Sequence, residues 1–80
     1  MSEDARSLST SQRVARARQD AGLSKMALAE RIGVRLFVID RYEAGSPIPS
    51  DHLELIAEAT GITAEYLRGE ITAPRPIAPL

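Results

Sequence analysis

The chain has 80 residues, of which 44% are hydrophobic and only 4% aromatic, so it can form one small domain with a modest core. It contains no cysteine and a single histidine, which excludes disulfides and thiolate metal sites, and we expect neither a metal nor another cofactor. The net charge is −1, but residues 1–41 carry +3 and residues 42–80 carry −4, so the first half can present a positive surface to an anionic partner.

The first nine residues are polar and include two acidic side chains. They contain no apolar run long enough for a signal sequence or a membrane span. We therefore expect residues 1–9 to form a flexible tail, and the protein to be cytoplasmic with no membrane partner.

A first helix is predicted after this tail, and it should run through Ala21. Ser9 and Gln12 fit a capping box, in which each side chain bonds the backbone N–H of the other residue. The apolar side chains of this helix would point inward. Arg13 and Arg16 are then expected on its other faces.

Two short helices joined by a tight turn are predicted next, over about residues 25–32 and 36–44. Ser24 can cap the first of them, and Gly33 stands where a helix end needs a positive φ. Apolar residues recur at helical spacing in both segments. Because the first helix is too short to be stable alone, the pair must pack against a supporting helix. The arrangement is typical of a helix-turn-helix, which makes duplex DNA the first partner to consider.

Residues 45–50, with the sequence GSPIPS, are predicted to form a loop, after which Ser50 caps a fourth helix. A fifth, short helix should begin after Thr63. Residues 71–80 are rich in proline and are expected to form an extended tail. The sequence thus predicts one all-α domain of five helices over residues 10–70.

The segment GLS, followed by LAERIGV and then by IDRYEAG, resembles the Cro/XRE family of phage-repressor DNA-binding domains. The resemblance spans about residues 11–69 and implies a five-helix bundle of the lambda-repressor-like DNA-binding type. It also implies a partly buried ion pair between Arg18 and Glu43. The function it implies is a small sequence-specific transcriptional regulator, a repressor that occupies its operator on double-stranded DNA as a homodimer.

The same resemblance places the DNA-contacting residues at the starts of the two motif helices. They are Ser24, Lys25, Arg35, Leu36, Phe37, Asp40 and Arg41. Arg35 and Arg41 are the expected base readers, because a guanidinium can bond both O6 and N7 of guanine. Lys25 is expected to hold a phosphate or to reach a base, and Asp40 to accept from cytosine or to orient an arginine.

Three features depart from this family. Arg35 replaces the usual Ser or Thr cap of the recognition helix, and its side chain cannot accept from a free backbone N–H. Leu36 and Phe37 replace polar residues. The loop GSPIPS carries no Lys or Arg that could hold the phosphate backbone.

Leu36 and Phe37 allow three interpretations: one of them turns into the core, both contact thymine methyl groups, or they form a patch for a protein. The third defines an alternative function, a helix-turn-helix-derived interaction module such as an antitoxin, an antirepressor or a regulatory adaptor. An enzyme is not expected, since the sequence offers no acid–base pair, activated nucleophile or phosphate-binding loop. Tyr66, Leu67 and Ile71 are expected to form a dimer contact, because that family pairs through its last helix.

Overall fold

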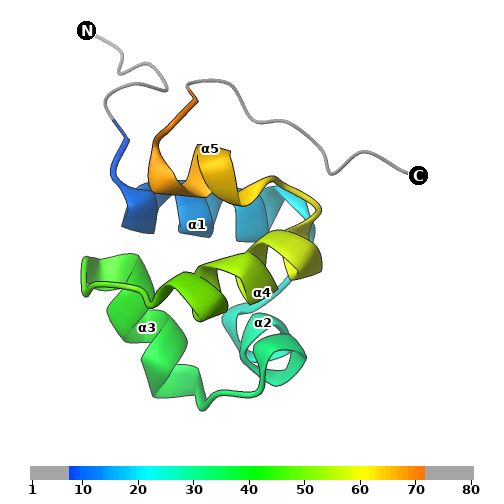
Figure 1. Cartoon of the computed structure of the whole chain (residues 1–80). Coiled ribbons are helices and arrows are strands. Elements are labelled where there is room, and N and C mark those ends of the chain that lie inside the picture. Colours follow the sequence, from blue (N-terminus) through cyan, green and yellow to red (C-terminus); the bar gives the residue numbers. More distant parts are fainter. Residues whose placement is uncertain (1–7, 72–80) are drawn as a thin grey trace, which may run out of the picture.

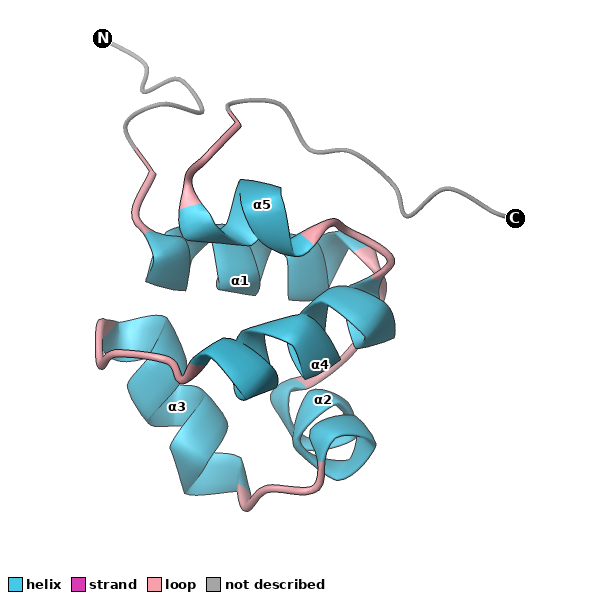
Figure 2. Ribbon diagram, viewed as in Figure 1, coloured by secondary structure: helices cyan, strands magenta, loops and turns pink. Residues whose placement is uncertain are grey.

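The structure, a computed structural model, describes residues 8–71, and within this range it contains five α-helices and no β-strand (Figure 2). The helices are α1 (Thr10–Asp20), α2 (Lys25–Ile32), α3 (Leu36–Ala44), α4 (Ser50–Thr60) and α5 (Ala64–Arg68). The predicted all-α fold class is confirmed. No helix in the described range is long and apolar enough to cross a membrane.

One core is shared by all five helices. Its largest fully buried side chains come one from each helix: Val14, Leu28, Ile39, Ile56 and Leu67. Fully burying such a side chain contributes about 1.5–3 kcal/mol, whereas helices of this length are marginal alone. Each helix is therefore held mainly by its packing against the others.

The helices are arranged so that the start of α3 projects from the molecule (Figure 1). Helices α1 and α5 lie side by side at one end, and α4 runs between them and α2. The loop from α2 to α3 and the first turn of α3 lie at the opposite end. The C-terminal part of α3 turns back toward α1.

The helix ends follow the predictions, except that α1 ends at Asp20 instead of Ala21 and that α4 lacks the predicted cap. Ser9 and Gln12 form the capping box of α1, with a Gln12 N to Ser9 Oγ distance of 3.2 Å. Gly33 ends α2 in the left-handed conformation, with φ of 79°, which glycine adopts without strain. Ser50 was expected to cap α4, but α4 begins at Ser50 itself, so Pro49 occupies the cap position and no side chain bonds there.

Arg13 is buried, with only 2% of its surface exposed, and this corrects the prediction that it lies on an outer face of α1. Its Nε donates to the Leu8 carbonyl at 3.2 Å, and its Nη1 donates to the carbonyls of Tyr66 at 2.8 Å and Ile71 at 3.1 Å. Its Cζ lies 4.9 Å from the centroid of the Tyr66 ring. These acceptors and the ring compensate the desolvation of the guanidinium, which sequence periodicity alone cannot anticipate.

The tails predicted over 1–9 and 71–80 fall mostly outside the described residues. Their described ends belong to the domain, because Leu8 and Ile71 both accept hydrogen bonds from Arg13. Ile71 is also partly buried against the core.

Candidate nucleic-acid interface

Helices α2 and α3 form a compact pair joined by a short turn at Gly33, Val34 and Arg35. Ser24 caps α2, and its Oγ accepts from Ala27 N at 3.0 Å. The cap position of α3 is held by Arg35 in an extended conformation, with no side-chain bond to the helix. The N–H groups of the first turn of α3 therefore lack the side-chain acceptor that α2 has.

Helix α3 divides into an inward and an outward face. Ile39 and Tyr42 are buried in the core, and Val38 is half-buried against it. The side chains proposed to contact DNA are all on the exposed side: Arg35, Leu36, Phe37, Asp40 and Arg41. The helix therefore presents one continuous exposed strip that starts at its projecting end.

An ion pair fixes α3 to α1. Arg18 Nε lies 2.6 Å from Glu43 Oε2, and Arg18 Nη2 lies 3.2 Å from Glu43 Oε1, so the contact is bidentate. The same guanidinium donates from Nη1 to the Leu23 carbonyl at 2.9 Å. One arginine thus holds both the end of α3 and the connection that leads into α2.

A second ion pair connects the start of α2 with the middle of α3. Lys25 Nζ lies 3.0 Å from Asp40 Oδ1, and the two side chains are 45% and 52% exposed. The partner of Asp40 is therefore Lys25, which corrects the expectation that Asp40 orients an arginine. Exposed pairs contribute little to stability, at most about 1 kcal/mol, so Lys25 is available to exchange this carboxylate for a phosphate.

Leu36 and Phe37 are both exposed, by 40% and 52% of their surface. The interpretation that one of them turns into the core is therefore wrong. The reason is that Ile39 and Tyr42 already fill the inward face of α3. Phe37 instead contacts Arg41, whose guanidinium carbon lies 5.4 Å from the centroid of the Phe37 ring.

Two further features of this region were not predicted from the sequence. Met26 in the first turn of α2 is 56% exposed, which adds a third large apolar side chain to the motif. The hydroxyl of Tyr42 lies 2.6 Å from Nδ1 of His52, so α3 is also bonded to α4. Burial raises the pKa of the Tyr42 phenol above its ordinary value of 10.0, and the nearby Asp51 carboxylate raises it further. The exposure of Met26 could have been predicted only from the spacing of the apolar residues in α2. No sequence signal predicts the contact between Tyr42 and His52.

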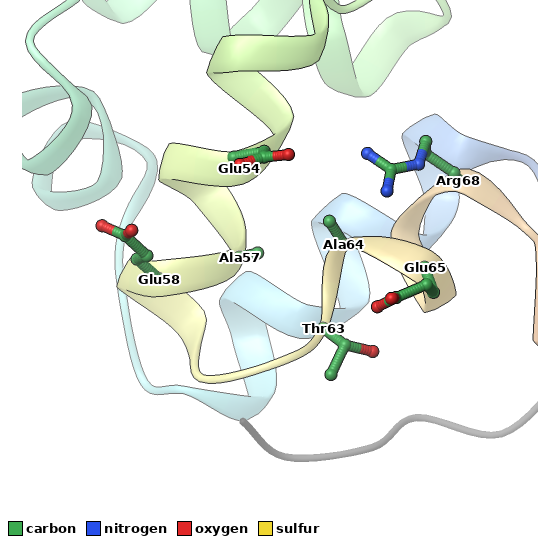
Figure 3. A pocket seen from close by; sticks show the side chains of 7 residues that line it. All are labelled: Glu54, Ala57, Glu58, Thr63, Ala64, Glu65 and Arg68. Atoms are coloured by element: carbon green, nitrogen blue, oxygen red, sulfur yellow. The ribbon is translucent and has the colours of Figure 1, made fainter. Parts of the chain in front are cut away.

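The opposite side of the domain is acidic. Figure 3 shows a shallow hollow between α4 and α5, whose lining includes the acidic residues Glu54, Glu58 and Glu65. The one basic side chain there, Arg68, is paired with Glu70, with 3.2 Å between Nε and Oε2. Such a surface repels phosphate, so it does not extend the exposed strip of α3 as a DNA-binding surface.

Tyr66 and Leu67 do not lie at a surface. They are 4% and 0% exposed and belong to the core, while Ile71 is partly buried beside them. This corrects the expectation that Tyr66 and Leu67 make a dimer contact. The physical reason is that α5 is so short that packing on the rest of the chain consumes its apolar side chains.

The paired helices, the projecting start of α3 and the exposed arginines define the class: this is a helix-turn-helix domain. The chain matches the family model described as helix-turn-helix over residues 14–67, and it belongs to this family, of the Cro/C1 type. The resemblance stated from the sequence is confirmed. The family comprises DNA-binding regulatory domains and is not an enzyme family, so the chain is a DNA-binding helix-turn-helix regulator. A comparison with curated proteins found no match.

Proposed function

We propose that this regulator is a sequence-specific repressor, which acts as a homodimer by occupying an operator. The observation that carries the proposal is the exposed strip of α3 at the projecting end of the molecule, where the guanidinium of Arg41 lies against the ring of Phe37. A strip of this kind fits the major groove, and DNA occupied there is closed to other proteins.

Arg41 and Arg35 are proposed to read guanine, and Lys25 to hold a phosphate. Arg41 is the better placed of the two readers, because its planar group is already oriented by Phe37. Arg35 lies at the uncapped start of α3, where DNA could supply an acceptor for the free backbone N–H groups. Lys25 lies beside the capped start of α2, where the helix dipole also favours an anion.

The homodimer is proposed because one copy of the strip is short. Helix α3 has nine residues and is therefore about 13 Å long at ~1.5 Å per residue. It covers only about four base pairs at ~3.4 Å each. Two copies on one face of the duplex, with recognition helices about 34 Å apart, would double the sequence that is read.

The alternative, a protein-interaction module, draws on the exposure of Met26, Leu36 and Phe37. The basic side chains of the motif favour DNA instead, because Lys25, Arg35 and Arg41 are all exposed. The centres of protein interfaces are depleted in charged residues, whereas DNA interfaces are strongly positive.

The experiment that tests the proposal is selection of the purified chain on a random duplex library, followed by anisotropy titrations of the enriched sequence at two salt concentrations. The proposal expects an enriched palindrome that is bound at least a thousandfold more tightly than random DNA, with two chains per duplex. Binding that is equally weak on all sequences and vanishes with salt would contradict it. That outcome would favour the protein-interaction module.

A further inference from the structure

We infer that Phe37 and Arg41 act as one composite reader, which recognises a guanine together with the methyl group of a thymine in the neighbouring base pair. This inference rests on the proposed function and adds the chemical class of the operator step that α3 reads. It assigns Phe37 a specificity role that its apolar side chain would not otherwise suggest.

Phe37 and Arg41 lie close enough on α3 to act together. Phe37 and Arg41 are four residues apart on α3, so their side chains share one face of the helix. The Arg41 Cζ lies over the Phe37 ring, 5.4 Å from its centroid, so the guanidinium and the apolar ring are in contact. Its N–H groups point outward in the guanidinium plane and do not need that face for hydrogen bonding.

The carboxylate next to Arg41 in the chain pairs with another residue. Asp40 is its neighbour on α3, but Asp40 is bonded to Lys25 at 3.0 Å. Within residues 8–71, Arg41 has no ion pair or side-chain hydrogen bond. In the free protein, Phe37 therefore orients Arg41 without using its donors, and these donors stay available for a base.

The geometry of base pairs in the major groove determines which bases such a pair of side chains can contact. A guanidinium that bonds O6 and N7 of guanine lies near the plane of that base pair. A ring stacked on the guanidinium is displaced along the DNA axis, so it meets the major-groove edge of the next base pair. On that edge the thymine methyl is the apolar group, while the other positions are hydrogen-bonding donors and acceptors that a phenyl ring would leave unpaired.

The probes that test this are duplexes in which one thymine at a time is replaced by uracil, which removes only the methyl group. The parent duplex is the sequence selected by the native chain. We expect one thymine per half-site whose replacement weakens binding by about fourfold, which corresponds to the roughly 0.8 kcal/mol of one buried methyl-sized group. That thymine should adjoin a guanine whose replacement by 7-deazaguanine, which lacks N7, also weakens binding.

Two variants test whether the thymine methyl is contacted by Phe37 or by another exposed apolar side chain of α3. Phe37→Ala should bind the parent duplex more weakly than the native chain and should show no further loss on the uracil duplex. Leu36→Ala removes the neighbouring exposed side chain, which has no guanidinium over it, and should keep the fourfold loss at that thymine. Both positions are exposed, so circular dichroism should show the native helix content in each variant.

The outcomes also distinguish this inference from the proposed function. A selected duplex whose uracil penalties are the same in the native chain and in Phe37→Ala would overturn the composite reader and leave the repressor proposal standing. Failure to select any duplex would contradict the repressor proposal and the composite reader together. A Phe37→Ala variant that binds the parent duplex like the native chain would overturn the reader and favour a protein partner for Phe37.

Discussion

Arg18 and Glu43 are joined by two hydrogen bonds of 2.6 and 3.2 Å across the gap between α1 and α3, and their side chains are only 11% and 8% exposed. The pair lies at the opposite end of α3 from the turn that is proposed to enter DNA. The pair therefore holds the C-terminal end of α3 against α1. The angle of α3 depends on Arg18, which lies 25 positions before Glu43 in the chain.

Breaking this pair should destabilise the whole domain. Glu43→Gln would leave the Arg18 charge buried without a counter-charge, which typically costs about 3–5 kcal/mol. Urea unfolding followed by circular dichroism measures the change in the free energy of unfolding. The matched control is Asp20→Asn, because the Arg16–Asp20 pair is 65% and 67% exposed and should contribute less than about 1 kcal/mol. Equal losses in the two variants would contradict the anchoring role.

Supplying the missing cap at the start of α3 should stabilise the protein. Arg35 has the extended conformation that a capping residue needs but offers no acceptor. Arg35→Ser should be about 1 kcal/mol more stable than Arg35→Ala, which raises the melting temperature by roughly 4–8 °C in a domain of this size. Thermal unfolding compares the two variants directly. Identical melting temperatures would show that the first turn of α3 is already satisfied.

Removing the carboxylate of Asp40 should strengthen binding to random DNA. Asp40→Asn releases Lys25 from its 3.0 Å ion pair and frees it for a phosphate. The slope of log affinity against log salt should then steepen by about 0.9, the value for one more neutralised phosphate. Anisotropy titrations over a salt series measure this slope. In the double variant Lys25→Gln/Asp40→Asn, the gain in affinity for random DNA should be smaller. A gain of the same size in the double variant would show that Lys25 is not the residue released.

Truncating either proposed base reader should lower specificity more than general affinity. Arg41→Ala and Arg35→Ala should each reduce binding to the selected duplex by roughly 1–3 kcal/mol, while binding to random DNA changes less. Parallel titrations on the selected and random duplexes give the two values. Equal losses on both duplexes would reassign the arginine to a phosphate.

The buried phenol of Tyr42 makes stability fall in alkali. Its folded-state pKa lies above 10.0, so the folded protein holds the phenolic proton more tightly than the unfolded chain does. The stabilisation is complete below pH 10 and is lost as the pH rises through the folded-state pKa. Tyr42→Phe should be less stable at pH 7 by about 1 kcal/mol, because the bond to His52 is lost. Urea midpoints measured from pH 7 to 11 should show this difference narrowing above pH 10, and a constant difference would contradict the assignment.

The local features of the fold could be predicted because they depend on residues close in the sequence. The bounds of α2 and α3 follow from Ser24, Gly33 and the apolar spacing, and the structure has them at the predicted residues. The ion pair between Arg18 and Glu43 is also present, although it was implied by the family resemblance and not by periodicity.

The errors concern side chains whose environment is set by residues far along the chain. Arg13 is buried because carbonyls more than 50 residues away accept its hydrogen bonds. The ion pair of Asp40 with Lys25 and the contact of His52 with Tyr42 are likewise tertiary. Their formation depends on how the helices pack, which the spacing of apolar residues does not specify. The projection of the α3 strip follows from the same packing.

Arg13 has a consequence for how the domain can be handled. Because its guanidinium bonds the carbonyls of both Leu8 and Ile71, the chain enters and leaves the domain at one place. That place lies at the end of the molecule away from the first turn of α3 (Figure 1). A fluorophore, a surface tether or a second protein attached next to Leu8 or Ile71 would start from the end of the molecule away from the first turn of α3. A short linker could also join the two ends of the domain, so that the chain could be reopened in another loop as a circular permutant.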